Sequence, residues 1–116
     1  MRFLVSAGPT REHIDPVRFL SNRSTGKMGF AIAEAAAMAG HEVVLVAGPV
    51  TLPTPEGVRR IDIISAREML SQLEAELGEA DILVMAAAVA DWRPKEAASV
   101  KLKKRSMSPV LELEPN

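Results

Sequence analysis

The sequence contains no cysteine. This excludes disulfides, thiol catalysis and a cysteine-based metal site, and it is compatible with a reducing compartment. An excess of one charge is also lacking: 14 Lys and Arg residues stand against 15 Asp and Glu residues, for a formal net charge of −1. No overall field therefore draws the chain to nucleic acid or to an anionic membrane, so any bound anion must be held locally. The first residues, MRFLVSAGP, show no cleavage pattern and are typical of a strand rather than a signal peptide, and we expect a cytoplasmic protein.

What the sequence does contain is the composition of one globular domain. Of its 116 residues, 47% are hydrophobic and 25% are charged, which excludes membrane, fibrous and disordered classes. A chain of this length buries roughly 65% of the surface that its unfolded form exposes. We therefore expect it to fold without disulfides.

Apolar segments alternate with helical patterns along the chain. This order indicates βαβ units and a Rossmann-like, doubly wound α/β fold with a mainly parallel sheet. In the helix from residue 27, the apolar positions are Met28, Ile32, Ala35, Ala36 and Ala39. The predicted elements are strands at 3–7, 43–47, 58–64 and 82–89, a helix at 27–39, and a second helix between a capping box at Ser65 and a glycine at 78.

The last of these strands, 82–89, is the most apolar and is therefore predicted to be central. Beyond residue 91 the pattern weakens, and segments 99–103 and 110–113 are predicted to pair as peripheral strands. One helix for each face leaves part of such a sheet uncovered. We expect either a partner or a longer chain to cover it, so that the sheet is incomplete at its C-terminal side.

The expected topology places a ligand site at one end of the sheet. Open α/β sheets bind ligands beyond the carboxyl ends of their strands, where the strand order reverses. Here that point is flanked by the loop from Gly8 and the loop 86–91. We therefore predict that these two loops, which are far apart in sequence, meet.

The segment 21–29, SNRSTGKMG, precedes and enters the first predicted helix. Free backbone N–H groups at a helix N-terminus attract anions, and Gly26 and Gly29 would let a phosphate approach closely. The alternative is an ordinary cap by Ser24 or Thr25, with the glycines required only for packing. The segment is neither a Walker A loop nor a full dinucleotide fingerprint, because Ser24 stands where the latter has its first glycine.

Four further residues are candidates for chemistry. Asn22 carries a donor and an acceptor at the mouth of the anion site and could polarise a carbonyl, or it could simply form an Asx turn. Arg18 could clamp a carboxylate or phosphate, or be solvated. Asp91, at the end of an alanine-rich strand, could bind a hydroxyl, an amide or Mg²⁺, or cap a turn. Lys101 lies in a basic run that either forms a solvated edge or delivers a lysine to a polyphosphate.

Six motifs, taken together in this order and spacing, resemble the phosphopantothenate–cysteine ligase family, also called phosphopantothenoylcysteine synthetase. The resemblance runs the length of the chain, so that residues 1–116 are similar to the nucleotide-binding front portion of such a ligase domain. The motifs are GPTR at 8–11, DPVR at 15–18, SNRSTGKMG at 21–29, GPV with LP at 48–53, AAVAD at 87–91 and KLKK at 101–104.

The resemblance implies a two-step ligation in coenzyme A biosynthesis. The carboxylate of 4′-phosphopantothenate attacks the α-phosphate of CTP, and cysteine then displaces CMP from the acyl-cytidylate. It also implies Mg²⁺ as cofactor and a homodimer. The flavin-dependent half that is often fused in bacteria is absent from this chain, so no FMN is expected.

By position, the resemblance assigns roles to residues of this chain. Asn22 and Lys101 match catalytic residues, the former for the acyl intermediate and the latter for activation. Arg18 and Ala88 match substrate-binding residues, and Arg18 matches an arginine that reaches the neighbouring subunit's substrate. The residues that match nucleotide-binding positions are Gly8, Ser24, Gly26, Gly29, Ala87 and Asp91.

Two rival interpretations remain. An NAD(P)-dependent oxidoreductase would use the same sheet, but Ala47-Gly48 stands where the ribose-binding acid belongs. The other rival is an inactive piece that folds and dimerises without turning over, since the family's domain is longer than this chain.

Overall fold

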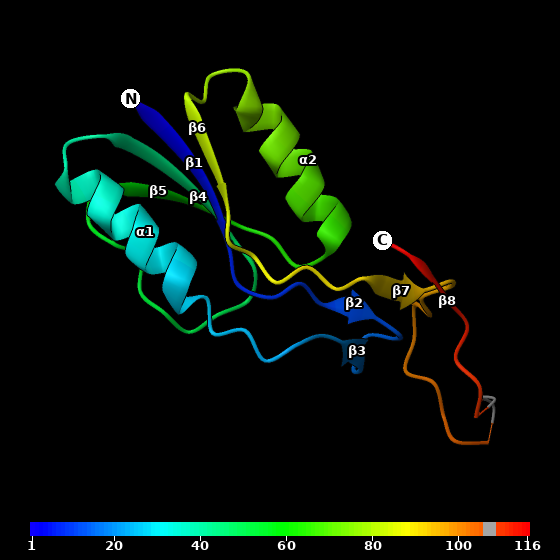
Figure 1. Ribbon diagram of the computed structural model, residues 1–116. Coiled ribbons are helices and arrows are strands. Elements are labelled where there is room, and N and C mark those ends of the chain that lie inside the picture. The colour runs from blue at the N-terminus through cyan, green and yellow to red at the C-terminus, as the bar shows by residue number, and fades with distance from the viewer. Residues whose placement is uncertain (106–108) are drawn as a thin grey trace.

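The body of the molecule is a four-stranded parallel sheet with one helix on each face (Figure 1). The computed structural model describes residues 1–105 and 109–116. The strand order is β5-β4-β1-β6, so β1 has neighbours on both sides. The elements of this body are β1 (Arg2–Ala7), α1 (Lys27–Met38), β4 (Glu42–Ala47), β5 (Val58–Asp62), α2 (Ala66–Leu77) and β6 (Ile82–Met85).

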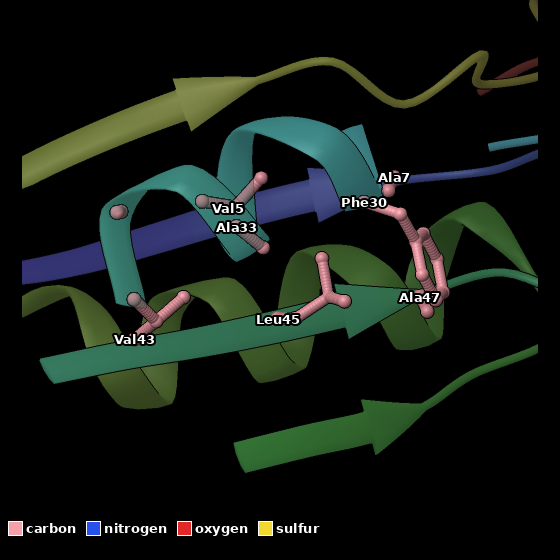
Figure 2. Packing of buried hydrophobic residues seen from close by; sticks show 8 residues of the cluster. Val5, Ala7, Phe30, Ala33, Val43, Leu45 and Ala47 are labelled. Carbon is pink, nitrogen blue, oxygen red and sulfur yellow. The ribbon is translucent and has the colours of Figure 1, made fainter. Parts of the chain in front are cut away.

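Alternate residues of the central strands face opposite helices, which makes the sheet doubly wound as predicted. On one face Val5 and Leu45 pack with Phe30 of α1 (Figure 2). On the other face Leu4 and Val44 pack with α2. Because β4 and β6 lie on opposite sides of β1, the strand order reverses at β1, and the predicted switch point is confirmed.

The buried face of α1 differs from the predicted one. The helix buries Gly29, Phe30, Ala33 and Ala36, whereas Met28 is 72% exposed. The reason is the close approach of Gly29 to β1, where an added Cβ would lie 2.4 Å from Cβ of Ala7. A count of apolar side chains does not register a glycine, so the pattern selected a face turned by about one residue.

The prediction that 82–89 is a central strand is wrong. The strand ends at Met85, and β6 is the edge strand of the sheet among the described residues. Leu83 and Met85 are exposed on the face that carries α2. Beyond Met85 the pairing continues only as single contacts, with the N–H of Ala86 donating to the carbonyl of Ser6 at 3.1 Å and an isolated parallel bridge between Pro9 and Ala88.

The peripheral strands also differ from expectation. Segment 99–103 forms no strand, and the observed antiparallel pair is β7 (Trp92–Pro94) with β8 (Leu113–Pro115). A second pair, β2 (Glu12–His13) with β3 (Phe19–Leu20), forms a hairpin inside the segment that was expected to be a polar loop. Strands of two or three residues are too short for a periodic pattern to reveal them.

Both small pairs lie at one end of the molecule, beyond the carboxyl ends of the sheet strands (Figure 1). The chain is accordingly elongated, with extents of 56 × 26 × 19 Å. We call residues 95–105, which extend from β7 along this end, the arm. None of the described helices is long and apolar enough to cross a membrane.

Candidate functional site

The N-terminus of α1 is open to a ligand. Its N-cap is Gly26, whose φ of +79° is in the left-handed region that favours glycine. Among the described residues, the side-chain contact to the first turn is a long one, from the N–H of Lys27 to Oγ1 of Thr25 at 3.4 Å. The first N–H groups of an α-helix have no partner inside the helix. The first turn also contains no acidic residue. This helix end therefore presents donors and the positive end of a dipole.

Glycines bring this helix end against the sheet. A Cβ at Gly29 would also lie 3.1 Å from Cα of Ala7, and one at Gly26 would lie 3.5 Å from Cα of Gly8. Gly8 itself has a φ of +81°. The three glycines thus form a narrow junction between β1 and α1 that side chains would obstruct.

A cavity of about 330 Å³ lies in front of the helix end. Residues 23–29 line most of it, so Ser24, Gly26 and Gly29 share one wall, and Ala86 closes it from the end of β6. Sequence reasoning placed the loop 86–91 at this site but assigned roles only to Ala87, Ala88 and Asp91, and none to Ala86. Strand alternation could have indicated it, because successive residues at the end of a strand face opposite sides of the sheet.

The two loops predicted to meet do meet. The N–H of Ala88 donates to the carbonyl of Gly8 at 2.8 Å, and the N–H of Thr10 donates back to the carbonyl of Ala88 at 3.3 Å. The Thr10 hydroxyl is fully buried and accepts from the N–H of Ala90 at 2.9 Å. Thr10 is a structural member of the site that sequence reasoning did not single out.

Asn22 joins three parts of the site. Its Nδ2 donates to the carbonyl of Ala88 at 2.7 Å, and its Oδ1 accepts from the N–H of Ser24 at 3.0 Å. The second bond is the Asx turn that was considered as the alternative to a chemical role. The first bond ties the mouth of the helix-end cavity to the alanine-rich loop.

Ala87 and Asp91 line a different cavity from the one at α1. This second cavity, of about 460 Å³, lies on the α2 side of the same loop. Most of its wall is apolar, with Met69, Leu73 and Met85 among its lining residues, and Asp91 and Arg67 contribute charge. The loop 86–91 therefore separates two cavities rather than lining one.

Arg18 pairs with a buried carboxylate. The Asp15 side chain is 0% exposed, and its Oδ2 accepts from Nε of Arg18 at 3.0 Å and from a terminal guanidinium nitrogen at 2.5 Å. The Arg18 guanidinium beside Asp15, helped by backbone N–H groups and opposed by burial, holds the pKa of that carboxyl well below its usual range. The carboxyl is therefore ionised at physiological pH. Sequence reasoning quoted Asp15 within a motif but assigned it no role.

Lys101 does not reach the helix-end cavity of its own chain. It is exposed on the arm, which lies at the end of the molecule away from α1 (Figure 1). The neighbouring Leu102 contacts Asp15 and Arg18 instead. The structure therefore brings together Gly8, Asn22, Ser24, Gly26, Gly29 and the Ala88 backbone, places Ala87 and Asp91 in the adjacent cavity, and leaves Arg18 and Lys101 together on the hairpin and arm.

Within the described residues, no three His, Asp or Glu side chains are grouped so that they could hold a metal ion. Asp91, at the end of the alanine-rich loop, is the residue predicted to bind a metal or a hydroxyl. It supplies a single carboxylate, and Mg²⁺ beside phosphates commonly uses one or two carboxylates.

A family model described as the DNA/pantothenate metabolism flavoprotein C-terminal domain matches residues 1–116. The chain belongs to this family. It is 52% identical over 113 residues to the coenzyme A biosynthesis bifunctional protein CoaBC of Vibrio cholerae, covering 97% of this chain and 28% of that protein. The resemblance to the ligase domain seen in the motifs is thereby confirmed.

Solved structures agree with the fold assignment. The crystal structure of the C-terminal domain of CoaBC matches with a TM-score of 0.86 and 45% identity, covering 99% of this chain and 53% of that one. A Cab2 H337A mutant in complex with phosphopantothenate-cysteine matches with a TM-score of 0.83 at 17% identity, over 99% of this chain and 56% of that one, which shows the shared fold. This member of the flavoprotein C-terminal domain family thus spans about half of the solved domains and about a quarter of the curated relatives.

Proposed function

We propose that residues 1–116 form the nucleotide-binding front portion of a phosphopantothenate–cysteine ligase that uses CTP. The observation that carries the proposal is the N-terminus of α1, which has a glycine cap and no acidic residue in its first turn and faces a cavity closed by the loop after β6. Family membership supports the reaction, since the similar CoaBC proteins are named for coenzyme A biosynthesis. As an enzyme of this class, we expect it to act in the cytoplasm.

The helix-end cavity suits the triphosphate. Gly8, Gly26 and Gly29 leave room for phosphate oxygens beside backbone N–H groups, and Ser24 adds a hydroxyl on the same wall. Mg²⁺ binds nucleotides through phosphate oxygens and one or two carboxylates. We therefore expect the ion to arrive with CTP and to neutralise phosphate charge. Asp91, which lies on the α2 side of the loop 86–91, is the candidate carboxylate of this chain for an ion beside the α-phosphate.

The cavity on the α2 side suits the uncharged parts of the substrates. Its apolar wall accepts a flat or aliphatic group, and Ala87 contributes only a small side chain to it. The nucleoside or the pantothenoyl chain would then lie across the loop 86–91 from the triphosphate. This arrangement places the α-phosphate near the loop, where the two substrates must meet.

The proposed reaction has two steps. A carboxylate oxygen of 4′-phosphopantothenate forms a bond to the α-phosphorus of CTP, and pyrophosphate leaves. The amine of cysteine then attacks the acyl carbonyl, loses a proton and expels CMP. Asn22 lies at the loop that would carry the acyl group, and its amide is suited to hold the carbonyl oxygen as negative charge develops.

The first step brings a carboxylate up to a triphosphate, so it needs positive charge. Lys101 is the residue assigned to this task, yet it lies on the arm and is not among the residues that line the α1 cavity of its own chain. We therefore propose a homodimer in which the arm and Arg18 of one copy reach the site of another. Phosphopantothenate and cysteine are the other expected ligands.

Ligand-dependent unfolding tests the nucleotide assignment. CTP with Mg²⁺ should raise the melting temperature of the chain by several degrees, because a ligand that binds only the folded state stabilises it. NADP at the same concentration should not. A shift with NADP alone would favour an oxidoreductase, although β4 ends in Ala47-Gly48 without the acid that binds a ribose.

Separate assays of the two steps test the residue roles. Lys101→Gln should reduce pyrophosphate release about 100-fold, as expected for loss of one charged contact to the reacting groups. Asn22→Asp should leave pyrophosphate release largely intact while amide formation falls. Equal loss of both steps in Asn22→Asp would contradict the role of Asn22. Absence of any pyrophosphate release from the unsubstituted chain would favour the inactive-piece interpretation.

A further inference from the structure

The arm is attached to the hairpin through one buried carboxylate. Asp15 lies between β2 and β3, and its two oxygens serve different parts of the chain. Oδ1 accepts from the N–H groups of Val17 at 2.9 Å and Arg18 at 2.8 Å, which closes the turn. Oδ2 accepts from the Arg18 guanidinium and, at 3.0 Å, from the N–H of Leu102, which is 87 residues away in sequence.

Both peptide groups of Leu102 are hydrogen-bonded to the Asp15–Arg18 pair. Its N–H donates to Asp15, and its carbonyl accepts from the Arg18 guanidinium at 2.5 Å. The N–H of Leu102 belongs to the peptide bond that joins it to Lys101. Asp15 and Arg18, which pair with each other, therefore hydrogen-bond to the backbone N–H and carbonyl of the same residue, Leu102, directly after Lys101.

The turn by itself does not require this ion pair. A neutral Asn or Ser at position 15 can supply the one oxygen that an Asx or Ser turn uses. A fully buried carboxylate is expensive unless several donors compensate it, and the compensating donors here include the arm. The charge of Asp15 is thus explained by its contact with Arg18 and Leu102 and not by the hairpin turn.

The rest of the arm has few ties of this kind. Residues 95–105 contain no helix or strand, and the N–H of Ala98, which donates to the carbonyl of Ile14 at 2.9 Å, is a second backbone tie to the hairpin. Lys101 lies between this tie and the ion pair. Its backbone is therefore fixed relative to the hairpin although its side chain is exposed.

We propose that Asp15, through Arg18 and the backbone of Leu102, is a positioning residue that sets where Lys101 is presented for the first step of the reaction. The inference rests on the proposed function for the role of Lys101, but the attachment of the arm is testable without it. Arg18 then has a role within its own chain in addition to any contact with a substrate.

Amide hydrogen exchange in the 116-residue chain tests the attachment. Asp15→Asn keeps the shape of the side chain but leaves one acceptor oxygen for both sets of donors. The N–H of Leu102 should then exchange at least about tenfold faster, because it competes with a guanidinium for a weaker acceptor. Amides of β1 and β4 should be unchanged, which shows that the sheet remains folded.

The matched control is Asp62→Asn, which removes an exposed carboxylate that also pairs with an arginine, Arg60. It should leave exchange at Leu102 unaltered. Unchanged exchange at Leu102 in Asp15→Asn would overturn the attachment. If Asp15→Asn unfolds the sheet, exchange is followed instead at the N–H of Ala98 in Leu102→Pro, which removes the donor at position 102 and leaves Asp15 in place. Unchanged exchange at Ala98 in this variant overturns the attachment equally.

A double-mutant cycle on pyrophosphate release tests the positioning role. If Asp15 acts through Lys101, then Asp15→Asn lowers kcat for this step with little change in the KM for CTP, and adding Asp15→Asn to Lys101→Gln causes no further loss. A merely structural role gives losses that multiply in the double variant, and this would overturn the proposal. If Lys101→Gln alone has no effect, the role of the lysine is wrong and the positioning role fails with it, whereas the exchange result still decides the attachment.

Discussion

The N-termini of α1 and α2 lie at the same end of the sheet, but their backbone N–H groups have different hydrogen-bond partners. At α2, Ser65 accepts from the N–H of Glu68 at 3.2 Å, and the buried Glu12 accepts from the N–H of Ala66 at 3.1 Å. At α1 the cap is a glycine with no side-chain bond. One helix end is thus satisfied by carboxylates and a hydroxyl of its own chain, while the other has one long contact, from the N–H of Lys27 to Oγ1 of Thr25 at 3.4 Å.

The third residue of each helix shows the difference most clearly. In α2 it is Glu68, whose carboxylate also accepts from the N–H of Ile64 at 2.9 Å. In α1 it is Gly29, which lies against the backbone of β1. A carboxylate in the first turn offsets the positive end of the helix dipole. A glycine does not, so the positive end remains available to an anionic ligand. The difference between the two helix ends supports the proposal that α1 binds an anion from outside the chain.

The close approach of α1 to the sheet should be the most sensitive feature. Gly29→Ala places a Cβ 2.4 Å from Cβ of Ala7 and 3.2 Å from the carbonyl oxygen of Ser6, so the helix must move. We expect a loss of about 1–3 kcal/mol in the free energy of unfolding, measured by urea denaturation. The control is Gly78→Ala, in open space at the end of α2 with a φ of −61°, which should be neutral or stabilising. Equal effects of the two substitutions would show that α1 does not depend on this contact.

The backbone conformation of the α1 cap comes next. Gly26→Ala forces an alanine into a φ of +79° and brings its Cβ within 3.1 Å of Val50. The expected loss is about 1–2 kcal/mol, the usual penalty of the left-handed region for a residue with a Cβ. Thermal unfolding followed by circular dichroism would detect it. A variant as stable as the parent would mean that the cap tolerates another conformation.

The α2 end is expected to respond to loss of its hydroxyl. Ser65→Ala removes the acceptor for the N–H of Glu68, and typical caps of this kind contribute about 1 kcal/mol. At α1 the corresponding contact is longer, from the N–H of Lys27 to Oγ1 of Thr25 at 3.4 Å, so Thr25→Ala is the matched substitution at the other helix and should change stability less. The two variants can be compared in a single denaturation series. A larger effect at Thr25 would reverse the contrast between the helix ends.

Much of this contrast could be predicted from the sequence. Ser65 and Glu68 at capping-box spacing predicted a closed end for α2, and the glycines of 21–29 predicted an anion site at α1. The meeting of the Gly8 loop with the alanine-rich loop followed from strand order alone. These features depend on local spacing or on topology, and both are visible in one chain.

The remaining features depend on contacts between distant residues. Nothing in the spacing of Asp15 indicates that its carboxylate accepts from Leu102, and the strands of β2 and β3 are two residues long. The division of the alanine-rich loop between two cavities depends on where β6 ends, which its apolar run conceals. Element boundaries and long-range polar contacts are thus the parts that pattern reasoning missed.

Making α1 resemble α2 should produce the smallest change in stability and still test the central contrast. Lys27→Glu places an acid in the first turn of α1, where there is none. A carboxylate near a helix N-terminus stabilises by about 0.3–1 kcal/mol, so the free energy of unfolding should be slightly higher in the variant than in the parent.

The same negative charge lies beside the proposed triphosphate cavity and should repel the triphosphate of CTP. We therefore expect opposite signs: higher stability without ligand, but a smaller thermal shift with CTP and Mg²⁺. Lys27→Gln is the control, since it removes the same lysine without placing a carboxylate in the first turn. If Lys27→Glu leaves the CTP shift unchanged, the open end of α1 does not bind the nucleotide.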